Sequence, residues 1–289
     1  MTTAIFRHID LTEQTANKKQ WTKVDADVTS FKRLEHKRSV HDIRGRESDF
    51  TTDNSGFAVY TSPSNEKSFT DDATVRGGYY DEVEALLRKT HPGIKKVVIF
   101  DHTIRRRVPG AARAPVQQVH VDQSPKAEEL LKGRFQIINV WRPIENPASD
   151  FPLAVIDWRT TEPADFVPVD LLYPKRADSA MDGNANDDDD RGKEKAPDET
   201  ALDSTEGYEV RGETMAVASN PKHKYYYLKD MTPDQALLLK CYDSFGEGQP
   251  MGRKGVAVRT PHTAFVDPQT PADAPGRQSI EVRCLVFYE

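Results

Sequence analysis

The sequence predicts a mainly β protein with a few flanking helices, which we interpret as a double-stranded β-helix, or jelly roll. Seven short runs rich in β-branched and aromatic residues have strand character, and turn residues separate them. Only two segments have clear helical character, which favours a sandwich or barrel. The spacing of the runs is too irregular for a repeat array. A length of 289 residues suits one large β domain.

The N-terminal quarter of the chain is polar and irregular. Residues 1–75 contain only short strand-like pieces, such as residues 57–60, between Gly and Pro residues. We therefore expect a single domain over residues 1–289, in which an N-terminal arm at 1–75 wraps a jelly-roll core at 76–289.

Two segments predict helices. Residues 79–89 carry Val and Leu on one helical face and end before a Pro-Gly pair. Residues 232–243 begin with Thr232 as a potential N-cap, followed by Pro at the first helical position and by Gln235 three residues after the cap. An apolar run then follows, so we expect a second helix there.

The strand-like runs make up most of the remaining sequence. Each combines β-branched or aromatic residues with flanking turn residues. They are residues 94–100, 116–121, 135–141, 153–158, 225–228, 255–259 and 279–288.

The net charge of −6 comes from one segment. Residues 175–207 hold five basic and eleven acidic residues, which leaves 35 of each sign in the rest of the chain. This segment has no aromatic residue, Val or Ile, so we expect a disordered acidic loop, with an acidic docking segment as the alternative. Without a basic excess, we expect no nucleic-acid partner and no anionic membrane partner, and a small-molecule substrate instead.

Targeting and redox signals are weak in this sequence. The longest apolar runs are far shorter than the roughly 20 residues of a membrane helix, and residues 1–7 lack the pattern of a secretory signal. We therefore expect a cytoplasmic protein. Cys241 and Cys284 form no CxxC motif and are interpreted as buried thiols.

A His-x-Asp pair is the first candidate for chemistry. His120 and Asp122 lie two residues apart in a strand-like run, so both side chains face one side of the sheet. An imidazole and a carboxylate from one strand supply two of the three ligands of the facial triad of non-haem Fe(II). A structural pair, in which the aspartate only orients the imidazole, is the alternative.

The C-terminal part supplies a possible third ligand and an anion site. His262 is followed fifteen residues later by Arg277, which shares a strand face with Ser279. The planar guanidinium of arginine makes two parallel hydrogen bonds to a carboxylate, and a serine hydroxyl can add another.

At these residues the sequence resembles the Fe(II)/2-oxoglutarate-dependent dioxygenases, because His120-x-Asp122, His262 and Arg277-x-Ser279 follow in the order of that family. Four further strings resemble its fungal gibberellin desaturase-like and AsaB-like hydroxylase/desaturase group. They are NVWRP at 139–143, HKYYY at 223–227, KCYDS at 240–244 and PHTAF at 261–265. The resemblance covers about residues 75–289 and omits the acidic loop.

The resemblance implies a jelly roll that uses Fe(II), 2-oxoglutarate and O2 in secondary metabolism. It implies that His120, Asp122 and His262 hold Fe(II), and that Arg277 with Ser279 pairs the distal carboxylate of 2-oxoglutarate. The expected reaction is hydroxylation or desaturation of a small organic scaffold, with decarboxylation of 2-oxoglutarate to succinate. The substrate does not follow from the resemblance.

Other residues have weaker assignments. Asn139 is a candidate to hydrogen-bond the oxo acid, or else a core amide. His223 is the rival third ligand, which we place near the pocket rather than on the metal. Arg142 is a reserve candidate for the carboxylate clamp, although strand alternation turns it to the other face. The cluster at 105–107 after His102 is interpreted as a solvated surface rather than a substrate site.

Two other classes of function stay open. Jelly rolls with His and carboxylate ligands include non-redox isomerases and cyclases, whose metal acts as a Lewis acid and which need no 2-oxoglutarate clamp. A catalytically silent binding subunit would turn over no 2-oxoglutarate. Arg277-x-Ser279 separates these classes best from an oxygenase.

Overall fold

The computed structural model describes residues 1–12, 19–24, 26–107, 118, 120–121, 133–175 and 204–289. Three expectations lie wholly or largely outside these ranges. They are Asp122 as a ligand, most of the strand expected at 116–121, and most of the acidic segment at 175–207.

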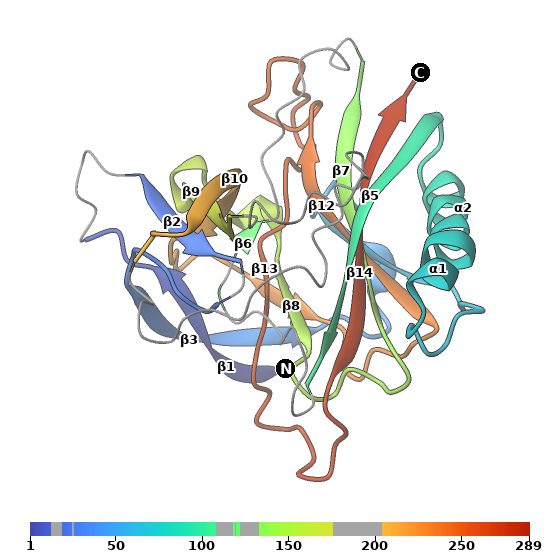
Figure 1. Cartoon of the computed structure of the whole chain (residues 1–289), viewed down its shortest axis with the longest axis horizontal. Coiled ribbons are helices and arrows are strands. Elements are labelled where there is room, and N and C mark those ends of the chain that lie inside the picture. Colours follow the sequence, from blue (N-terminus) through green and yellow to red (C-terminus); the bar gives the residue numbers. More distant parts are fainter. Residues whose placement is uncertain (13–18, 25, 108–117, 119, 122–132, 176–203) are drawn as a thin grey trace.

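Strands dominate the described residues (Figure 1). In chain order the strands are β1 (Thr2–Ile9), β2 (Gln20–Lys23), β3 (Arg33–Asp42), β4 (Phe57–Thr61), β5 (Ile94–Arg106), β6 (His120–Val121), β7 (Phe135–Pro143), β8 (Leu153–Ile156), β9 (Phe166–Pro174), β10 (Tyr208–Val217), β11 (Tyr225–Tyr227), β12 (Gln235–Asp243), β13 (His262–Ala264) and β14 (Gln278–Tyr288). The helices and helical turns are η1 (Glu47–Asp49), α1 (Asp72–Thr74), η2 (Val75–Tyr79), α2 (Tyr80–Thr90), η3 (Trp158–Thr160) and η4 (Pro163–Asp165).

The strands that the structure describes form two sheets. The larger sheet has nine strands in the order β1-β3-β11-β8-β13-β6-β10-β9-β2, and the smaller has five in the order β4-β12-β7-β14-β5. One apolar cluster joins the two sheets, because it contains Leu153 and Val155 of β8 together with Trp141 of β7 and Leu239 of β12. The mainly β jelly-roll fold class is thereby confirmed.

The first predicted helix is confirmed as α2, which covers the outer face of the smaller sheet (Figure 1). Its apolar residues Val83, Leu86 and Leu87 pack in one cluster with Ile280 and Val282 of β14. Because the buried positions of β14 alternate with positions of the opposite face, the odd-numbered residues of β14 face away from α2.

The second predicted helix is wrong, because residues 235–243 form strand β12. The backbone N–H of Thr232 donates to the side chain of Gln235, so the expected capping residues form a turn that leads into the strand. In β12, Ala236 and Leu238 pack toward α2, whereas Leu237 and Leu239 pack between the sheets. A strand buried on both faces has a continuous apolar run, which hydrophobic periodicity does not separate from a buried helix.

The run at 255–259 does not form a strand. Gly255 has a positive φ of 80°, and the backbone N–H of Ala257 bonds to the Asp53 carbonyl in a loop rather than to a neighbouring strand. The other described runs contain strands near the expected positions.

The N-terminal segment is more regular than the sequence suggests. It contributes β1, β2 and β3 to the larger sheet and β4 to the smaller one. The strand-like piece at 57–60 is thereby confirmed, whereas the expectation of only short strand-like pieces is wrong, because β1 and β3 are long strands. The division into an arm and a core stays a prediction.

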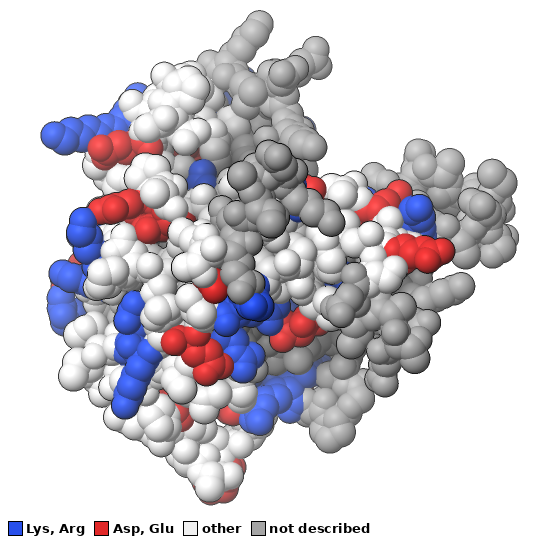
Figure 2. Space-filling model, turned by 90° about the vertical axis from the view of Figure 1, so that its left-hand side faces the viewer, with Lys and Arg blue, Asp and Glu red and all other residues white. Residues whose placement is uncertain are grey.

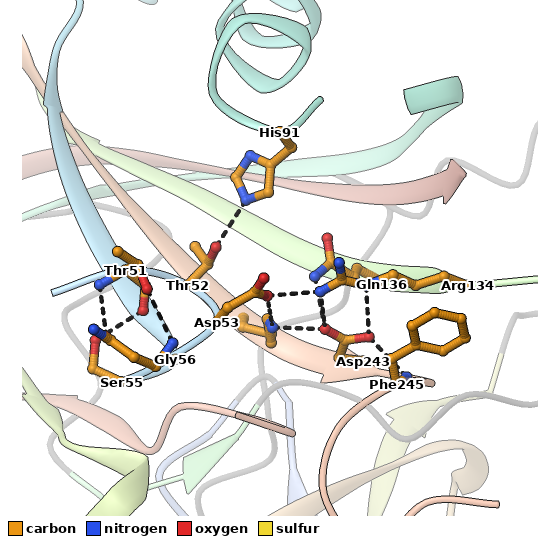
Figure 3. A network of polar contacts seen from close by, with 12 residues as sticks. Thr51, Thr52, Asp53, Ser55, Gly56, His91, Arg134, Gln136, Asp243 and Phe245 are labelled. Carbon is orange, nitrogen blue, oxygen red and sulfur yellow. Dashed lines mark hydrogen bonds and ion pairs between the residues drawn. The ribbon is translucent and has the colours of Figure 1, made fainter. Parts of the chain in front are cut away.

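A polar network connects the start of β7 with the end of β12 in the smaller sheet (Figure 3). Lys240 Nζ is 2.6 Å from Asp243 Oδ2 and 2.8 Å from Asp53 Oδ1, and the side chains of Lys240 and Asp243 are fully buried. Arg134 Nη2 lies 2.7 Å from Asp243 Oδ2 and 2.6 Å from Asp53 Oδ1. The pKa of Asp243 is lowered because the hydrogen bonds and charges of Arg134 and Lys240 outweigh its burial.

The face formed by the larger sheet carries charges of both signs. Figure 2 shows Lys and Arg side chains among Asp and Glu side chains on this face. Lys19 is 2.5 Å from Asp170, and Arg7 is 3.2 Å from Glu35. Among the described residues, no helix is both long enough and apolar enough to cross a membrane.

Candidate active site

His120 and His262 are brought together by strand pairing in the larger sheet. Strand β13 lies between β8 and β6, and His262 is the antiparallel partner of both His120 and Val155. The ring centroids of the two histidines are 4.6 Å apart, with 52° between the ring planes. Directly paired residues face the same side of a sheet, and Val155 belongs to the cluster between the sheets. The two imidazoles therefore face the interior.

Each of the two rings contacts the backbone carbonyl two residues before it in the chain. The Nδ1 atom of His120 is 2.8 Å from the carbonyl oxygen of Gln118, and the Nδ1 atom of His262 is 3.1 Å from that of Thr260. A carbonyl oxygen only accepts hydrogen bonds, so each Nδ1 carries the proton. In the neutral form of such a ring, Nε2 is the nitrogen that carries the lone pair, and this is the form in which a histidine binds a metal.

The third expected ligand, Asp122, lies outside the described residues. Within the part of the chain that the structure describes, no group of three His, Cys, Asp or Glu residues is arranged to hold a metal ion. The described geometry therefore brings two imidazoles together, whereas the carboxylate of Asp122, two residues after His120, stays a prediction.

Arg277 is buried beside the inner face of the smaller sheet, with 3% exposure. Its Nη1 donates to the carbonyl oxygen of Phe151 at 2.8 Å, and its guanidinium lies 5.6 Å from the ring of Trp141. Its Nε atom has no hydrogen-bond partner among the described residues. Burial and the charge of Arg105 lower the pKa of Arg277 to about 9. Such a buried, incompletely paired cation favours an anionic ligand.

The backbone of Arg277 is held in place by its surroundings. Its N–H donates to Asp150 Oδ2 at 3.1 Å, and its carbonyl oxygen accepts from the N–H of Arg107. Gly276 permits this approach, because a Cβ there would lie 2.3 Å from the Arg107 carbonyl oxygen.

Ser279, an odd-numbered residue of β14, and Asn139 of β7 lie on the inner face of the smaller sheet. Ser279 is buried in β14 and pairs with Pro143 of β7. Asn139 is fully buried in β7, where it pairs with Arg283 of β14. Ser279 and Asn139 thus come from adjacent strands of the smaller sheet and Arg277 directly precedes β14, whereas His120 and His262 come from the larger sheet.

Comparison with known proteins identifies the family. The family model described as "Oxidoreductase/YMDC permease-like domain" matches residues 7–190 and 193–287. The hydroxylase/desaturase efuI of Hormonema carpetanum is 32% identical over 279 residues, which cover 86% of this chain and 83% of efuI. The Fe(II)/2-oxoglutarate-dependent dioxygenase nvfI of Aspergillus novofumigatus is 30% identical, with 89% of this chain and 85% of nvfI covered. The chain belongs to this family of hydroxylase/desaturases and Fe(II)/2-oxoglutarate-dependent dioxygenases.

The fold of a solved family member agrees with this assignment. The structure of the iron and alpha-ketoglutarate-dependent endoperoxidase NvfI superimposes with a TM-score of 0.71 at 26% identity, covering 99% of this chain and 97% of NvfI. The resemblance to fungal Fe(II)/2-oxoglutarate-dependent dioxygenases seen in the sequence is thereby confirmed.

Within this family fold, two rival assignments have other surroundings. His223 Nε2 is 2.9 Å from Asp165 Oδ2, and its ring neighbours are His8 and Tyr225 rather than His120 or His262. Arg142 lies on the α2 side of β7, where its Nη1 donates to the carbonyl oxygens of Ser62 and Pro233. Arg142 is therefore unsuited to clamp a carboxylate between the sheets.

The sequence analysis did not predict the ion pairs on the inner face of the smaller sheet. Arg105 lies 2.9 Å from Glu281, and Arg283 Nε lies 2.7 Å from Asp101 Oδ1. Arg106 instead bonds Gln278, so the basic cluster at 105–107 is divided between two faces. The signal was present in the sequence, because Glu281 and Arg283 follow Arg277 and Ser279 at intervals of two.

Proposed function

We propose that this chain is a non-haem Fe(II)/2-oxoglutarate-dependent oxygenase that hydroxylates or desaturates a small organic scaffold in secondary-metabolite biosynthesis, with decarboxylation of 2-oxoglutarate to succinate. The observation that carries the proposal is the pair of interior imidazoles His120 and His262, in a family whose members are named for this chemistry.

The donor set fits Fe(II). His120 and His262 present two imidazoles whose Nδ1 atoms contact backbone carbonyls, which makes Nε2 the nitrogen that would bind a metal. Asp122 supplies the carboxylate from the same chain segment as His120. Two histidines and one carboxylate leave open positions on the metal, as the facial triad requires.

The buried cation fits 2-oxoglutarate. Arg277, just before β14, has an Nε donor without a described partner, and Ser279 is a buried residue near the start of β14. We assign both to the distal carboxylate, and Asn139 to the oxo-acid end. When bound, Fe(II), 2-oxoglutarate and O2 supply the oxidant, with release of succinate and CO2.

The remaining work of the protein is orientation and exclusion of water. Trp141 and Val155 line an apolar cavity between the sheets. Val155 pairs with His262 in the strand register, and the ring of Trp141 lies 5.6 Å from the guanidinium of Arg277. A dry, low-dielectric interior strengthens the ion pair between Arg277 and a carboxylate. The chain thereby fixes the direction of the cosubstrate, while the redox chemistry comes from the bound groups.

An anaerobic titration tests this function. Protein freed of metal is loaded with Fe(II) and then titrated with 2-oxoglutarate, and the visible charge-transfer band of the chelate is recorded. We expect a band for the wild type and its loss in His262→Ala and Arg277→Ala. Arg106→Ala is a matched control, because this neighbouring arginine bonds Gln278 on the other side of the strand.

Other outcomes would favour other classes. Bound metal without any band would indicate a non-redox jelly-roll enzyme. Absence of metal binding in the wild type would contradict the proposal and favour a binding subunit. A band that persists in Arg277→Ala with unchanged affinity would remove Arg277 from the cosubstrate site.

A further inference from the structure

A second arginine lies close to the proposed cosubstrate clamp. Arg105 of β5 and Glu281 of β14 form an ion pair of 2.9 Å, and their side chains are only 18% and 14% exposed. Three charged side chains, Arg105, Arg277 and Glu281, therefore gather on the inner face of the smaller sheet.

The strand register places Arg105 between the other two charges. Arg105 is the direct partner of Ser279, and Thr103 is the partner of Glu281. The next backbone contact along the strands joins the N–H of Arg107 to the carbonyl oxygen of Arg277. Arg105 thus lies level with Ser279, halfway along the strand between Arg277 and Glu281.

The electrostatics agree with this placement. After burial, Arg105 is the largest cause that lowers the pKa of Arg277, whereas Glu281 and Asp150 raise it. Glu281 is therefore a potential counter-ion for Arg277. Its carboxylate is instead hydrogen-bonded to Arg105, and the Arg277 guanidinium bonds a neutral backbone carbonyl.

We propose that Arg105 is a positioning residue that holds the Glu281 carboxylate away from Arg277, and so keeps the Arg277 guanidinium available for the distal carboxylate of 2-oxoglutarate. This inference rests on the proposed function. The three side chains together carry one net positive charge, which matches the single distal carboxylate of the cosubstrate.

Removal of Arg105 would change this balance. Glu281 would then lose its ion pair with Arg105, and the net charge of the three side chains would fall to zero. In a poorly solvated site, a nearby carboxylate both competes for the guanidinium and repels an incoming anion. Removal of Glu281 as well should restore the positive site.

Four variants test the proposal through 2-oxoglutarate affinity in the anaerobic, Fe(II)-loaded protein. The affinity is measured by the charge-transfer band and by calorimetry. We expect Arg105→Met to weaken 2-oxoglutarate binding by about tenfold or more. Arg105→Lys and the double variant Arg105→Met/Glu281→Gln should bind within about threefold of the wild type, and Glu281→Gln alone at least as tightly as the wild type.

Two controls separate this role from a structural one. Asp101→Asn breaks the neighbouring ion pair between β5 and β14, and should leave 2-oxoglutarate affinity within about threefold of the wild type. The ligand 2-oxobutanoate has the same oxo-acid end but no distal carboxylate, so it should bind the wild type and Arg105→Met equally. Melting temperatures of all variants show whether each is folded.

Three results would overturn the proposal while 2-oxoglutarate still binds the wild type. They are unchanged affinity in Arg105→Met, a double variant as weak as Arg105→Met, and weaker binding in Glu281→Gln alone. The last measurement decides the matter even if Arg105→Met does not fold. Absence of a band in the wild type would instead contradict the proposed function.

Discussion

His120 and His262 lie opposite each other in β6 and β13, and each ring donates its Nδ1 proton to the backbone carbonyl two residues earlier in the chain. The ring centroids are 4.6 Å apart. In both rings, a backbone carbonyl just before the strand thus helps to set the orientation of the imidazole. This arrangement favours a preformed pair of nitrogen ligands.

Replacement of either histidine should remove iron. We expect His120→Ala and His262→Ala to lose stoichiometric Fe(II) binding, because two protein ligands are too few for a stable site. His223→Gln should keep it, since His223 bonds Asp165 elsewhere. The measurement is the metal content after loading and desalting under anaerobic conditions. Loss of iron in His223→Gln with retention in His262→Ala would exchange their roles.

The buried charge of Arg277 should lower the unfolding free energy of the protein, although the same charge should be needed to bind 2-oxoglutarate. Its guanidinium is buried with an Nε donor that lacks a described partner, so Arg277→Met should stabilise the protein by about 1 kcal/mol, because replacing a buried charge with a well-packed apolar side chain is often favourable. The same variant should lose 2-oxoglutarate binding. Chemical denaturation of the metal-free protein measures the first effect. A destabilised Arg277→Met would show that the contact with Phe151 is worth more than the burial costs.

The polar network of Lys240, Asp243 and Arg134 should contribute to the free energy of unfolding. Lys240→Met leaves Asp243 buried without one of its two cationic partners, so we expect a loss of about 3 kcal/mol in unfolding free energy. Lys67→Met is the matched control, because the Lys67–Asp234 pair is 3.8 Å long and exposed, and should cost under about 1 kcal/mol. Equal losses in urea denaturation would contradict this prediction.

Acid should destabilise the fold through two buried histidines. Burial lowers the pKa values of His8 and His91 to about 4, below the ordinary 6.5. Between these values the unfolded chain binds more protons than the folded one, so stability falls as the pH drops from about 6.5 to about 4. Each group contributes up to about 3 kcal/mol.

Unfolding free energies at pH 7.5, 6 and 4.5 test the acid effect. His8→Gln should show a shallower loss than the wild type over this interval, because one of the two groups is removed. An identical slope in both proteins would show that His8 does not titrate as expected.

The sequence allowed some elements to be predicted because their apolar residues are periodic. The alternation of β14 and the one-sided face of α2 have this property. Strand β1 was missed, since its inward positions are Thr2, Ala4, Phe6 and His8, which do not form an apolar stripe. Strand β12 was mistaken for a helix because both of its faces are buried.

The sequence predicts those features of the candidate site that depend on spacing along a single strand. The positions of Arg277 and Ser279 follow from alternation, whereas the pairing of His120 with His262 depends on contacts between strands 142 positions apart in the sequence. The ion pair between Arg105 and Glu281 was missed for the same reason, because β5 and β14 meet only in the folded sheet.

The alternation of β14 also has a consequence for protein engineering. Even-numbered positions such as Val282 and Cys284 form the core under α2, whereas odd-numbered positions face the interior between the sheets. A mutant library confined to positions 281, 283 and 285 would therefore vary the face between the sheets while it leaves the helix-facing layer intact. Randomisation of consecutive positions would also change the core under α2, so diversification in steps of two is the route that spares this core.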